Sequence, residues 1–401
     1  MKPVIVVHHH EITLKGENRP FFERQLLQNV KRSLARIVPS SAIRGGYGKF
    51  IIDVPAPELT NSIVDRLTKV FGLANICSGV RVEQDIGVIS RTAEKLLENQ
   101  EFHSIKVHTR RSDKRFPIGS MEVNARVGEY LCERFKVRAN LTQPDETIYI
   151  EIVDGDAYVY LSKIQGPGGL PVGVSGKVVG LISAGFDSPV ASWQLMKRGA
   201  SVLFVHFHSM PYTSEHSVEQ VRCIVEALTT YQFRSKLYLV PFAEVQNEIV
   251  LHTPSPLRVI LYRRMMVRIG EHIARENNAE ALVTGEAVGQ VASQTLRNIR
   301  IINDVATLPI LRPLSGMDKE ETMAIAKKIG TYDISKEPYD DCCSYLAPRK
   351  PSTWAKREDV EAAESALHIP KLIELAINNM TYEVFTFPKI KHAEHAETSI
   401  V

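Results

Sequence analysis

The chain has 401 residues and a mass of 45.0 kDa, which is enough for roughly two to four domains. With 44% hydrophobic and 24% charged residues it has the composition of a folded globular protein, which excludes an intrinsically disordered chain. No apolar run approaches the about 20 residues of a membrane-spanning helix, and the apolar N-terminal stretch is too short for a signal peptide, so we expect a cytoplasmic protein without membrane contact.

Strand-like and helical patterns alternate through the first 165 residues, which predicts small α+β domains. The expected strands lie at 4–7, 49–54, 104–109, 147–153 and 157–161, and the expected helices at 20–38, 59–70 and 120–135. Within this part, residues 106–115 hold five basic residues and one acidic residue. We predict a surface that faces phosphates, although a solvated loop at a strand edge would give the same pattern. The cations are Lys106, Arg110, Arg111, Lys114 and Arg115.

The clearest domain boundary lies at residues 165–176, where five glycines and two prolines occupy twelve positions. After it, strands and helices alternate regularly, which predicts a parallel, doubly wound sheet of the α/β class. The expected strands lie at 177–183, 200–208, 236–241 and 281–284, and the expected helices at 189–198, 214–231, 257–277 and 320–329. Ligands bind at the carboxyl ends of such strands, so the loops after Ile182, Val205 and Thr284 are the first places to look.

The segment Ser183-Ala-Gly-Phe-Asp-Ser188 joins a buried strand to a helix and is the first candidate phosphate site. Small residues let backbone N–H groups approach an anion at the positive end of a helix, and serine hydroxyls add hydrogen bonds. Asp187 would be positioned there to hold Mg²⁺ on a pyrophosphate. No other segment has the pattern of a P-loop or of a dinucleotide-binding loop.

This loop resembles the SGGxDS signature of PP-loop ATP pyrophosphatases, which cleave ATP to AMP and pyrophosphate while they adenylate a substrate. Ala184 departs from the signature where glycine is usual. Its methyl group would either crowd a phosphate or require a negative φ, because only glycine adopts positive φ freely.

Longer segments resemble the ThiI family, whose members are tRNA 4-thiouridine synthases, also called tRNA sulfurtransferases. The similar segments are 11–22, 205–215, 261–266, 284–295 and 337–344. The resemblance covers nearly the whole chain. It implies a ferredoxin-like domain at 1–63, a THUMP RNA-binding domain at 64–165, a linker at 166–176, a PP-loop domain at 177–390 and a tail at 391–401.

Together, the loop and the resemblance define the candidate nucleotide contacts. The resemblance implies that ATP touches seven positions on strand ends and on a helix that faces them, and the loop itself adds Ser183, Gly185 and Ser188. The positions implied by the family are Leu181, Ile182, His206, Phe207, Arg263, Gly285 and Gln294.

The chain has five cysteines at irregular spacings and no CxxC pair, which excludes a disulfide framework and a zinc module. Cys77, Cys132 and Cys223 lie in apolar patterns, and we expect them to be packing residues. Cys342 and Cys343 lie in a polar segment, where a thiolate can accept sulfur as a persulfide. The resemblance implies that Cys343 is the catalytic cysteine, with Cys342 a close competitor. The acidic residues beside them, which raise a thiol pKa, favour the alternative of two buried packing residues.

The resemblance implies a reaction in which ATP and Mg²⁺ adenylate O4 of a uridine in tRNA, at position eight by the family pattern. Persulfide sulfur then replaces AMP to give 4-thiouridine. The implied partners are tRNA, a cysteine desulfurase as sulfur donor, a sulfur carrier of thiamine thiazole synthesis and a second copy of the chain. The sequence has no segment for the extra rhodanese domain of some members, so we expect sulfur to reach Cys343 directly or through an external thiol.

Other interpretations stay open on the sequence alone. A PP-loop ligase that acts on a small molecule would need neither the basic segment nor Cys343. A chain whose loop is inactivated by Ala184 would be an RNA-binding protein without catalysis. His8-His-His10 stands where the family commonly has an Arg-Tyr-Gly-like sequence; a metal site is one interpretation, but neighbouring strand residues point to opposite faces, which favours a structural variation.

Overall fold

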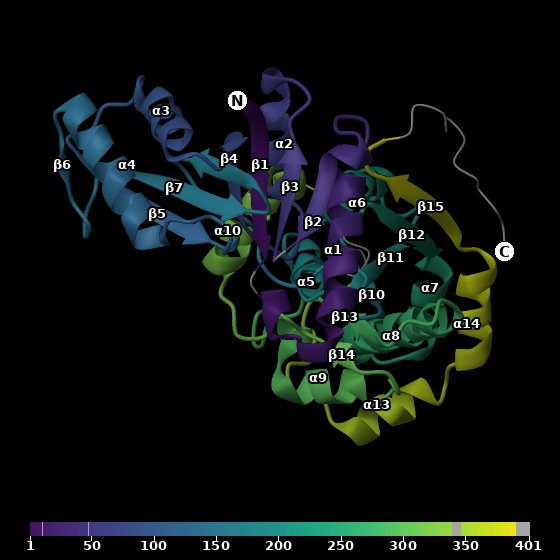
Figure 1. The fold of residues 1–401 in the computed structure, drawn as a ribbon. Helices are drawn as coiled ribbons and strands as arrows, with labels where there is room; N and C mark the ends of the chain where they lie inside the picture. The colour runs from purple at the N-terminus through teal and green to yellow at the C-terminus, as the bar shows by residue number, and fades with distance from the viewer. Residues whose placement is uncertain (10, 47, 339–345, 390–401) are drawn as a thin grey trace. The chain divides into compact units, whose positions relative to one another are not determined.

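The computed structural model describes residues 1–9, 11–46, 48–338 and 346–389, and the chain divides into two compact units, Met1–Pro171 and Val172–Val401 (Figure 1). We call them the N-terminal and C-terminal units and describe each by itself. Among the described residues, no helix is long and apolar enough to cross a membrane.

The N-terminal unit is built on one sheet of nine strands in the order β2-β3-β1-β4-β8-β7-β5-β6, with β9 paired to β4. The longest strand, β4, pairs with β1 on one side and with β8 on the other, so it belongs to both halves of the sheet. The strands are β1 (Lys2–His9), β2 (Ile43–Gly46), β3 (Lys49–Asp53), β4 (Leu73–Glu83), β5 (Ser104–Arg111), β6 (Arg138–Ala139), β7 (Glu146–Val153), β8 (Asp156–Tyr160) and β9 (Ile164–Gln165). The helices are α1 (Arg19–Ser33), α2 (Thr60–Leu67), α3 (Ile86–Leu97) and α4 (Ser120–Phe135).

The expected strands and helices of this unit are present, but the short strands β2, β6 and β9 and two longer elements were not predicted. The first is β4, whose burial does not alternate, so it lacks the period-2 signal of a half-buried strand. The second is α3, which is amphipathic and is capped by Asp85, whose side chain accepts a hydrogen bond from the Val88 amide. Helix α1 also ends at Ser33, earlier than the expected helix over 20–38.

The C-terminal unit contains a six-stranded sheet in the order β14-β13-β10-β11-β12-β15. Strands β14 to β12 are parallel, as the alternation predicted, and β15 joins the edge antiparallel to β12. The strands are β10 (Lys177–Leu181), β11 (Ser201–His208), β12 (Arg234–Pro241), β13 (Ala281–Val283), β14 (Ile310–Leu311) and β15 (Thr381–Thr386). The helices are α5 (Asp187–Lys197), α6 (His216–Gln232), α7 (Ala243–His252), α8 (Arg258–Glu276), α9 (Leu296–Asn303), α10 (Lys319–Ile329), α11 (Tyr332–Lys336), α13 (Arg357–Glu364) and α14 (Ile369–Asn378).

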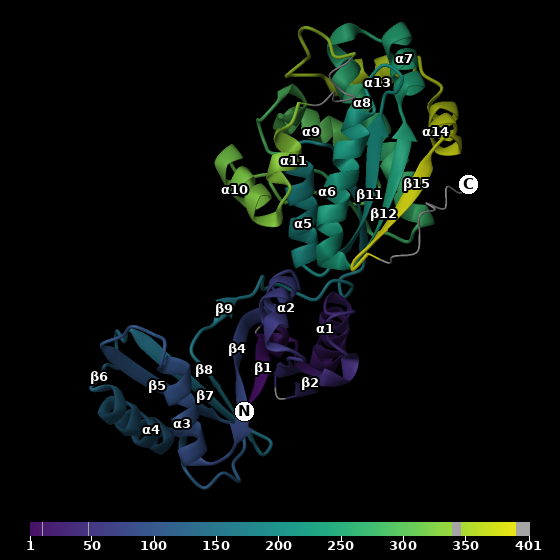
Figure 2. The same cartoon turned by 90° about the horizontal axis from the view of Figure 1, so that it is seen from above.

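Strand alternation assigns the helices of this unit to the two faces of the sheet. Val205 and Phe207 of β11 pack in the same core cluster as Met265 and Ile269 of α8. Because neighbouring strand residues point to opposite faces, Phe204 faces the other side, where α5 and α6 lie side by side (Figure 2). Because helices cover both faces of the sheet, the loops at the strand ends are where a ligand can reach it.

A capping box is present at the start of α10, the helix expected at 320–329. The Asp318 side chain accepts from the Glu321 amide, and the Glu321 side chain accepts from the Asp318 amide. The helix ends at Gly330, whose φ of 78° is accessible to glycine without strain. This cap fixes the position of Lys319, the first residue of α10.

The consecutive histidines point to opposite faces of β1, as their strand position predicts. His8 Nε2 donates to Glu151 of β7 at 2.7 Å, and His9 Nε2 lies 3.2 Å from Glu23 of α1. No cluster of three or more potential metal ligands occurs among the described residues, a set that excludes His10. The contacts with Glu151 and Glu23 make the two described histidines part of the packing between strands and helix.

Glu151 is a buried carboxylate that holds the strands of the N-terminal unit together. It accepts hydrogen bonds from His8, from Lys49 of β3 and from the Tyr160 hydroxyl of β8. Burial by itself raises the pKa of Glu151, but the hydrogen bonds and charges of His8 and Lys49 outweigh burial and hold that pKa well below its usual value.

We expect this carboxylate to make the N-terminal unit sensitive to acid. A carboxyl whose pKa is lower in the folded state stabilises above the unfolded value, near 4.5, and loses that contribution as the pH falls. Glu151→Gln should destabilise the unit by about 3 kcal/mol at pH 7 and should flatten the pH dependence below about pH 5. Hydrogen exchange of β7 amides measures this, and wild-type protection that does not weaken relative to the variant in acid would contradict it.

Candidate active site

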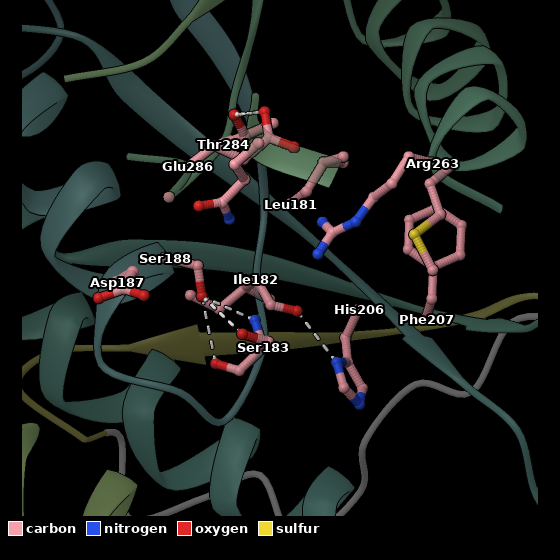
Figure 3. Close-up of a pocket in the computed structure, with 13 residues that line it drawn as sticks. Leu181, Ile182, Ser183, Asp187, Ser188, His206, Phe207, Arg263, Thr284 and Glu286 are labelled. Carbon is pink, nitrogen blue, oxygen red and sulfur yellow. Dashed lines mark hydrogen bonds between the residues drawn. The ribbon is translucent and has the colours of Figure 1, made fainter. Parts of the chain in front are cut away.

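A pocket opens at the carboxyl ends of β10, β11 and β13, the edge at which the doubly wound sheet was expected to bind ligand (Figure 3). Most of the predicted nucleotide contacts line it, although they come from segments far apart in the chain. The predicted residues in its lining are Leu181, Ile182, Ser183, Asp187, Ser188, His206, Phe207, Arg263, Gly285 and Gln294. Gly185 does not contribute to the lining, and Cys342 and Cys343 lie outside the described residues.

The loop before α5 is held by its own serines. The Ser188 hydroxyl accepts from the Ser183 amide at 2.9 Å and lies 3.1 Å from the Ser183 hydroxyl. Helix α5 begins at Asp187, so its first N–H groups, which have no partner within the helix, face the loop. Ala184 is 1% exposed and does not adopt positive φ, so its methyl group packs inward without backbone strain. The departure from glycine at this position is compatible with the loop.

Gly285, just after β13, lets its loop approach the backbone of Asp187 and Ser188 closely. A Cβ atom there would lie 2.5 Å from the Ser188 nitrogen and 2.6 Å from the Asp187 carbonyl carbon. Contacts this short with backbone atoms cannot be relieved by a rotamer change. Only glycine therefore lets the loop after β13 pack directly on the first turn of α5.

His206 and Arg263 form the side of the pocket opposite Asp187 (Figure 3). His206 Nδ1 lies 3.0 Å from the Ile182 carbonyl, which requires a proton on Nδ1 because a carbonyl oxygen only accepts. This bond ties the end of β11 to the end of β10. Arg263 extends from α8 toward the middle of the cavity, where a guanidinium suits a phosphate.

The Asp187 carboxylate, the predicted Mg²⁺ ligand, contacts two donors. Its oxygens lie 3.3 Å from Lys319 Nζ and 3.0 Å from Gln290 Nε2. Both partners are exposed, long side chains, so they can exchange Asp187 for phosphate oxygens. Nothing local to Lys319 in the sequence distinguishes it from an ordinary helix cation.

Three further residues line the pocket and were not singled out: Met266, Thr284 and Glu286. Glu286 is only 4% exposed, and its carboxylate accepts from Arg312 Nε at 2.6 Å and from the Thr284 hydroxyl at 3.0 Å. This buried ion pair fixes the loop that contains Gly285. Thr284 and Glu286 stand on either side of Gly285 in the segment 284–295. That position could have identified both as pocket residues from the sequence.

Comparison with known proteins identifies the relatives of this chain. Its sequence matches the ThiI ferredoxin-like domain over residues 4–77, the THUMP domain over 83–162 and the thiamine biosynthesis protein (ThiI) family over 173–369. It is 40% identical to a probable tRNA sulfurtransferase of Thermus thermophilus, over 98% of this chain and 96% of that protein. The chain belongs to the ThiI family.

A further relative and two solved structures are also similar to this chain. A probable tRNA sulfurtransferase of Moorella thermoacetica is 40% identical over 94% of this chain and 96% of its own length. The crystal structure of a 4-thiouridine synthetase–RNA complex with bound ATP superposes with a TM-score of 0.88 and 36% identity, covering 96% of this chain and all of that one. PH1313 of Pyrococcus horikoshii matches with a TM-score of 0.61 and 25% identity, covering 82% of this chain and 99% of that one.

The predicted RNA contacts fall on β5 and the loop after it, in the THUMP region. Arg111 donates to the Phe116 carbonyl at 2.7 Å, and Arg115 pairs with Asp113 at 2.9 Å, so these two cations also support the loop. Lys106 donates to the Leu141 carbonyl at 2.8 Å, whereas Arg110 and Lys114 are exposed.

An aromatic row lies on the same side of the sheet as Lys106 and Arg110. His108 of β5 contacts Tyr149 of β7 edge-on at 5.9 Å between ring centres, and Tyr149 stacks on Tyr160 at 5.3 Å. Lys163 Nζ lies 3.6 Å from the centre of the Tyr149 ring. Tyr160 is buried, so the predicted surface combines cations with the partly exposed rings of His108 and Tyr149, which sequence spacing alone did not reveal.

The remaining cysteines differ from one another in burial. Burial raises the pKa of Cys77 to about 12, which makes it an inert packing residue. Cys132 is half-buried and packs against the THUMP core, as expected. The expectation for Cys223 was wrong, because this residue is exposed on α6. Its apolar neighbours in sequence point to the core, but position 223 falls on the solvent side of the helix.

Proposed function

We propose that this chain is an ATP-dependent tRNA sulfurtransferase that adenylates a uridine of tRNA, position eight by family resemblance, and converts it to 4-thiouridine. The observation that carries the proposal is the pocket at the end of β10, β11 and β13, in which ten of the predicted site residues meet. Support comes from the ATP and RNA named for the 4-thiouridine synthetase that this chain resembles over 96% of its length.

In the first step, O4 of the uridine attacks the α-phosphorus of ATP. An O–P bond forms, the bond to pyrophosphate breaks, and the N3 proton passes to water. The N–H groups at the start of α5 and the Ser183 and Ser188 hydroxyls hold phosphate oxygens, and Arg263 and Lys319 offset the developing negative charge. Gly285 brings the next loop against this site, so water is displaced from one side of the phosphates.

The residues present fit Mg²⁺ that arrives with ATP. Magnesium in nucleotide sites takes one or two carboxylates and several phosphate oxygens, and Asp187 and Glu286 are the carboxylates of the pocket lining. Asp187 would hold the ion, since Glu286 is engaged by Arg312. When bound, Mg²⁺ neutralises charge on the pyrophosphate as it leaves.

In the second step, the terminal sulfur of a persulfide on Cys343 attacks C4 of the activated uridine. The C4–O bond breaks and AMP leaves. A second thiol, on Cys342 or an external molecule, then cleaves the sulfur–sulfur bond and forms a disulfide with Cys343, which a reducing thiol reopens. Described residues before and after Cys342 and Cys343 in the chain are attached to two helices of the C-terminal unit. The Glu337 carbonyl accepts from Gln220 of α6, and the Leu346 carbonyl accepts from Tyr262 of α8, the helix that also contains Arg263.

The partners follow from this chemistry and from the family. tRNA would lie on Lys106, Arg110, Arg111, Lys114 and Arg115 through phosphates and shape. A cysteine desulfurase would supply sulfur to Cys343, and a sulfur carrier of thiamine thiazole synthesis would be a second acceptor. We propose a homodimer on the strength of the resemblance.

The test is mass spectrometry of nucleosides from unmodified tRNA incubated with the full chain, ATP, Mg²⁺, cysteine and a cysteine desulfurase. We expect 4-thiouridine, and we expect none when ATP is omitted. Absence of 4-thiouridine with a desulfurase that modifies tRNA through another ThiI enzyme would overturn the proposal.

A further inference from the structure

An exposed tryptophan lies on the C-terminal unit. Trp354 is 70% exposed, and the guanidinium carbon of Arg297 lies 4.8 Å from the centre of its ring. Because the arginine covers one face of the ring, the exposed area belongs to the other face and the edges. A ring held in this way can stack with another flat group at little entropic cost.

The surroundings of this ring are strongly basic. The two segments that meet here, residues 287–303 and 346–357, contain six arginines and lysines and no aspartate or glutamate, and Asp304, Glu358 and Asp359 follow directly after them. Of these cations, Arg357 is paired with Asp304 at 2.7 Å. Arg300, Arg349, Lys350 and Lys356 are exposed and lie outside that pair. Such an excess attracts a polyanion and repels a basic partner.

The tryptophan is held at a fixed place beside the nucleotide pocket. Asn298 of α9 is fully buried, and its Nδ2 donates to the carbonyls of Ala292 at 2.7 Å and Ser352 at 2.9 Å. Its Oδ1 accepts from the Ala355 amide at 3.2 Å. Ala292 begins the short turn that contains Gln294, a lining residue of the pocket. Figure 1 shows α9 beside α13, which begins just after Trp354.

We propose that the surface formed by Trp354, Arg297, Arg300, Lys350 and Lys356, the Trp354 platform, binds the tRNA substrate. A base or ribose stacks on Trp354 while phosphates contact the cations, which places RNA next to the pocket where its uridine reacts. The inference rests on the proposed function, since it names a further contact for the same substrate. Stacking together with exposed cations fits RNA better than a protein partner, whose surface presents few flat groups.

Two sets of variants of the full chain test the platform with unmodified tRNA. Trp354→Ala should weaken tRNA binding by about 5- to 100-fold at fixed salt, and Trp354→Phe should keep most of the affinity. Lys350→Glu combined with Lys356→Glu should lower the slope of log affinity against log salt by about 1 to 2. Lys371→Glu, an exposed cation on α14, is the matched control and should change neither quantity by this much.

Each outcome decides between the platform and its alternatives. Unchanged tRNA affinity in both sets would overturn the proposal. Unchanged tRNA affinity with slower transfer from a desulfurase, but not from inorganic sulfide, would make the surface a docking site for the donor and would also overturn it. A wild-type chain that binds tRNA through Trp354 but forms no 4-thiouridine would refute the proposed function and leave the platform supported, so the two failures are distinguishable.

Discussion

Replacing Cys343 by alanine should abolish 4-thiouridine formation, with a loss of at least about 10³-fold, while ATP binding stays within about twofold of wild type. The reason is that, in the proposed second step, the persulfide on Cys343 carries the sulfur atom that attacks C4. Adenylation uses residues of the pocket and does not need the thiol. Nucleoside mass spectrometry measures the product, and isothermal calorimetry measures ATP binding.

Cys342→Ala is the matched control for this prediction. It should form 4-thiouridine in a single turnover and slow in later turnovers unless a reducing thiol is added. Full activity of Cys343→Ala together with loss in Cys342→Ala would assign the persulfide to Cys342. Full activity in both variants would instead favour a PP-loop ligase that acts on another substrate.

Gly285→Ala should reduce ATP affinity by about 100-fold, although the side chain adds only one carbon. Its Cβ atom would lie 2.5 Å from the Ser188 nitrogen, so the loop after β13 and the first turn of α5 have to separate. Displacement of a binding group by about 1 Å costs on the order of 10²-fold in comparable sites. Calorimetric titration with ATP measures the loss.

Gly316→Ala controls for the loss of a glycine as such. No atom lies within 4 Å of a Cβ built on Gly316, so we expect wild-type ATP affinity. Thermal unfolding of both variants shows whether the C-terminal unit stays folded. Wild-type affinity in a folded Gly285→Ala protein would mean that the two loops do not act together on ATP.

Much of the fold could be predicted because its signals are local. The alternation of strand and helix after residue 176 predicted the parallel sheet, and the Ser183–Ser188 loop followed from small residues between a buried strand and a helix. The capping box at Asp318 is equally local, since its two partners lie three residues apart. The antiparallel edge strand β15 was not predicted, because six residues near the end of the chain give no indication of which strand they join.

The sequence predicted the part of the candidate site that lies at the ends of the parallel strands. Residues after β10, β11 and β13 were expected to converge, and they line one pocket. Glu286 was missed because its importance comes from Arg312, a residue that becomes its neighbour only when β13 and β14 pair. The Ala184 methyl group was expected either to crowd a phosphate or to require a negative φ. Its φ is not positive and its side chain is buried, and both properties depend on packing that the sequence does not display.

The sequence by itself determined the α/β class, the order of the units and the residue types at the strand ends, since hydrophobic periodicity and turn chemistry act over a few residues. Tertiary structure alone decided which distant groups touch. It brought Lys319 to Asp187, Glu151 to His8 and Arg297 to Trp354. Each contact joins residues more than 50 positions apart, and their meeting depends on how whole strands and helices pack rather than on any local pattern.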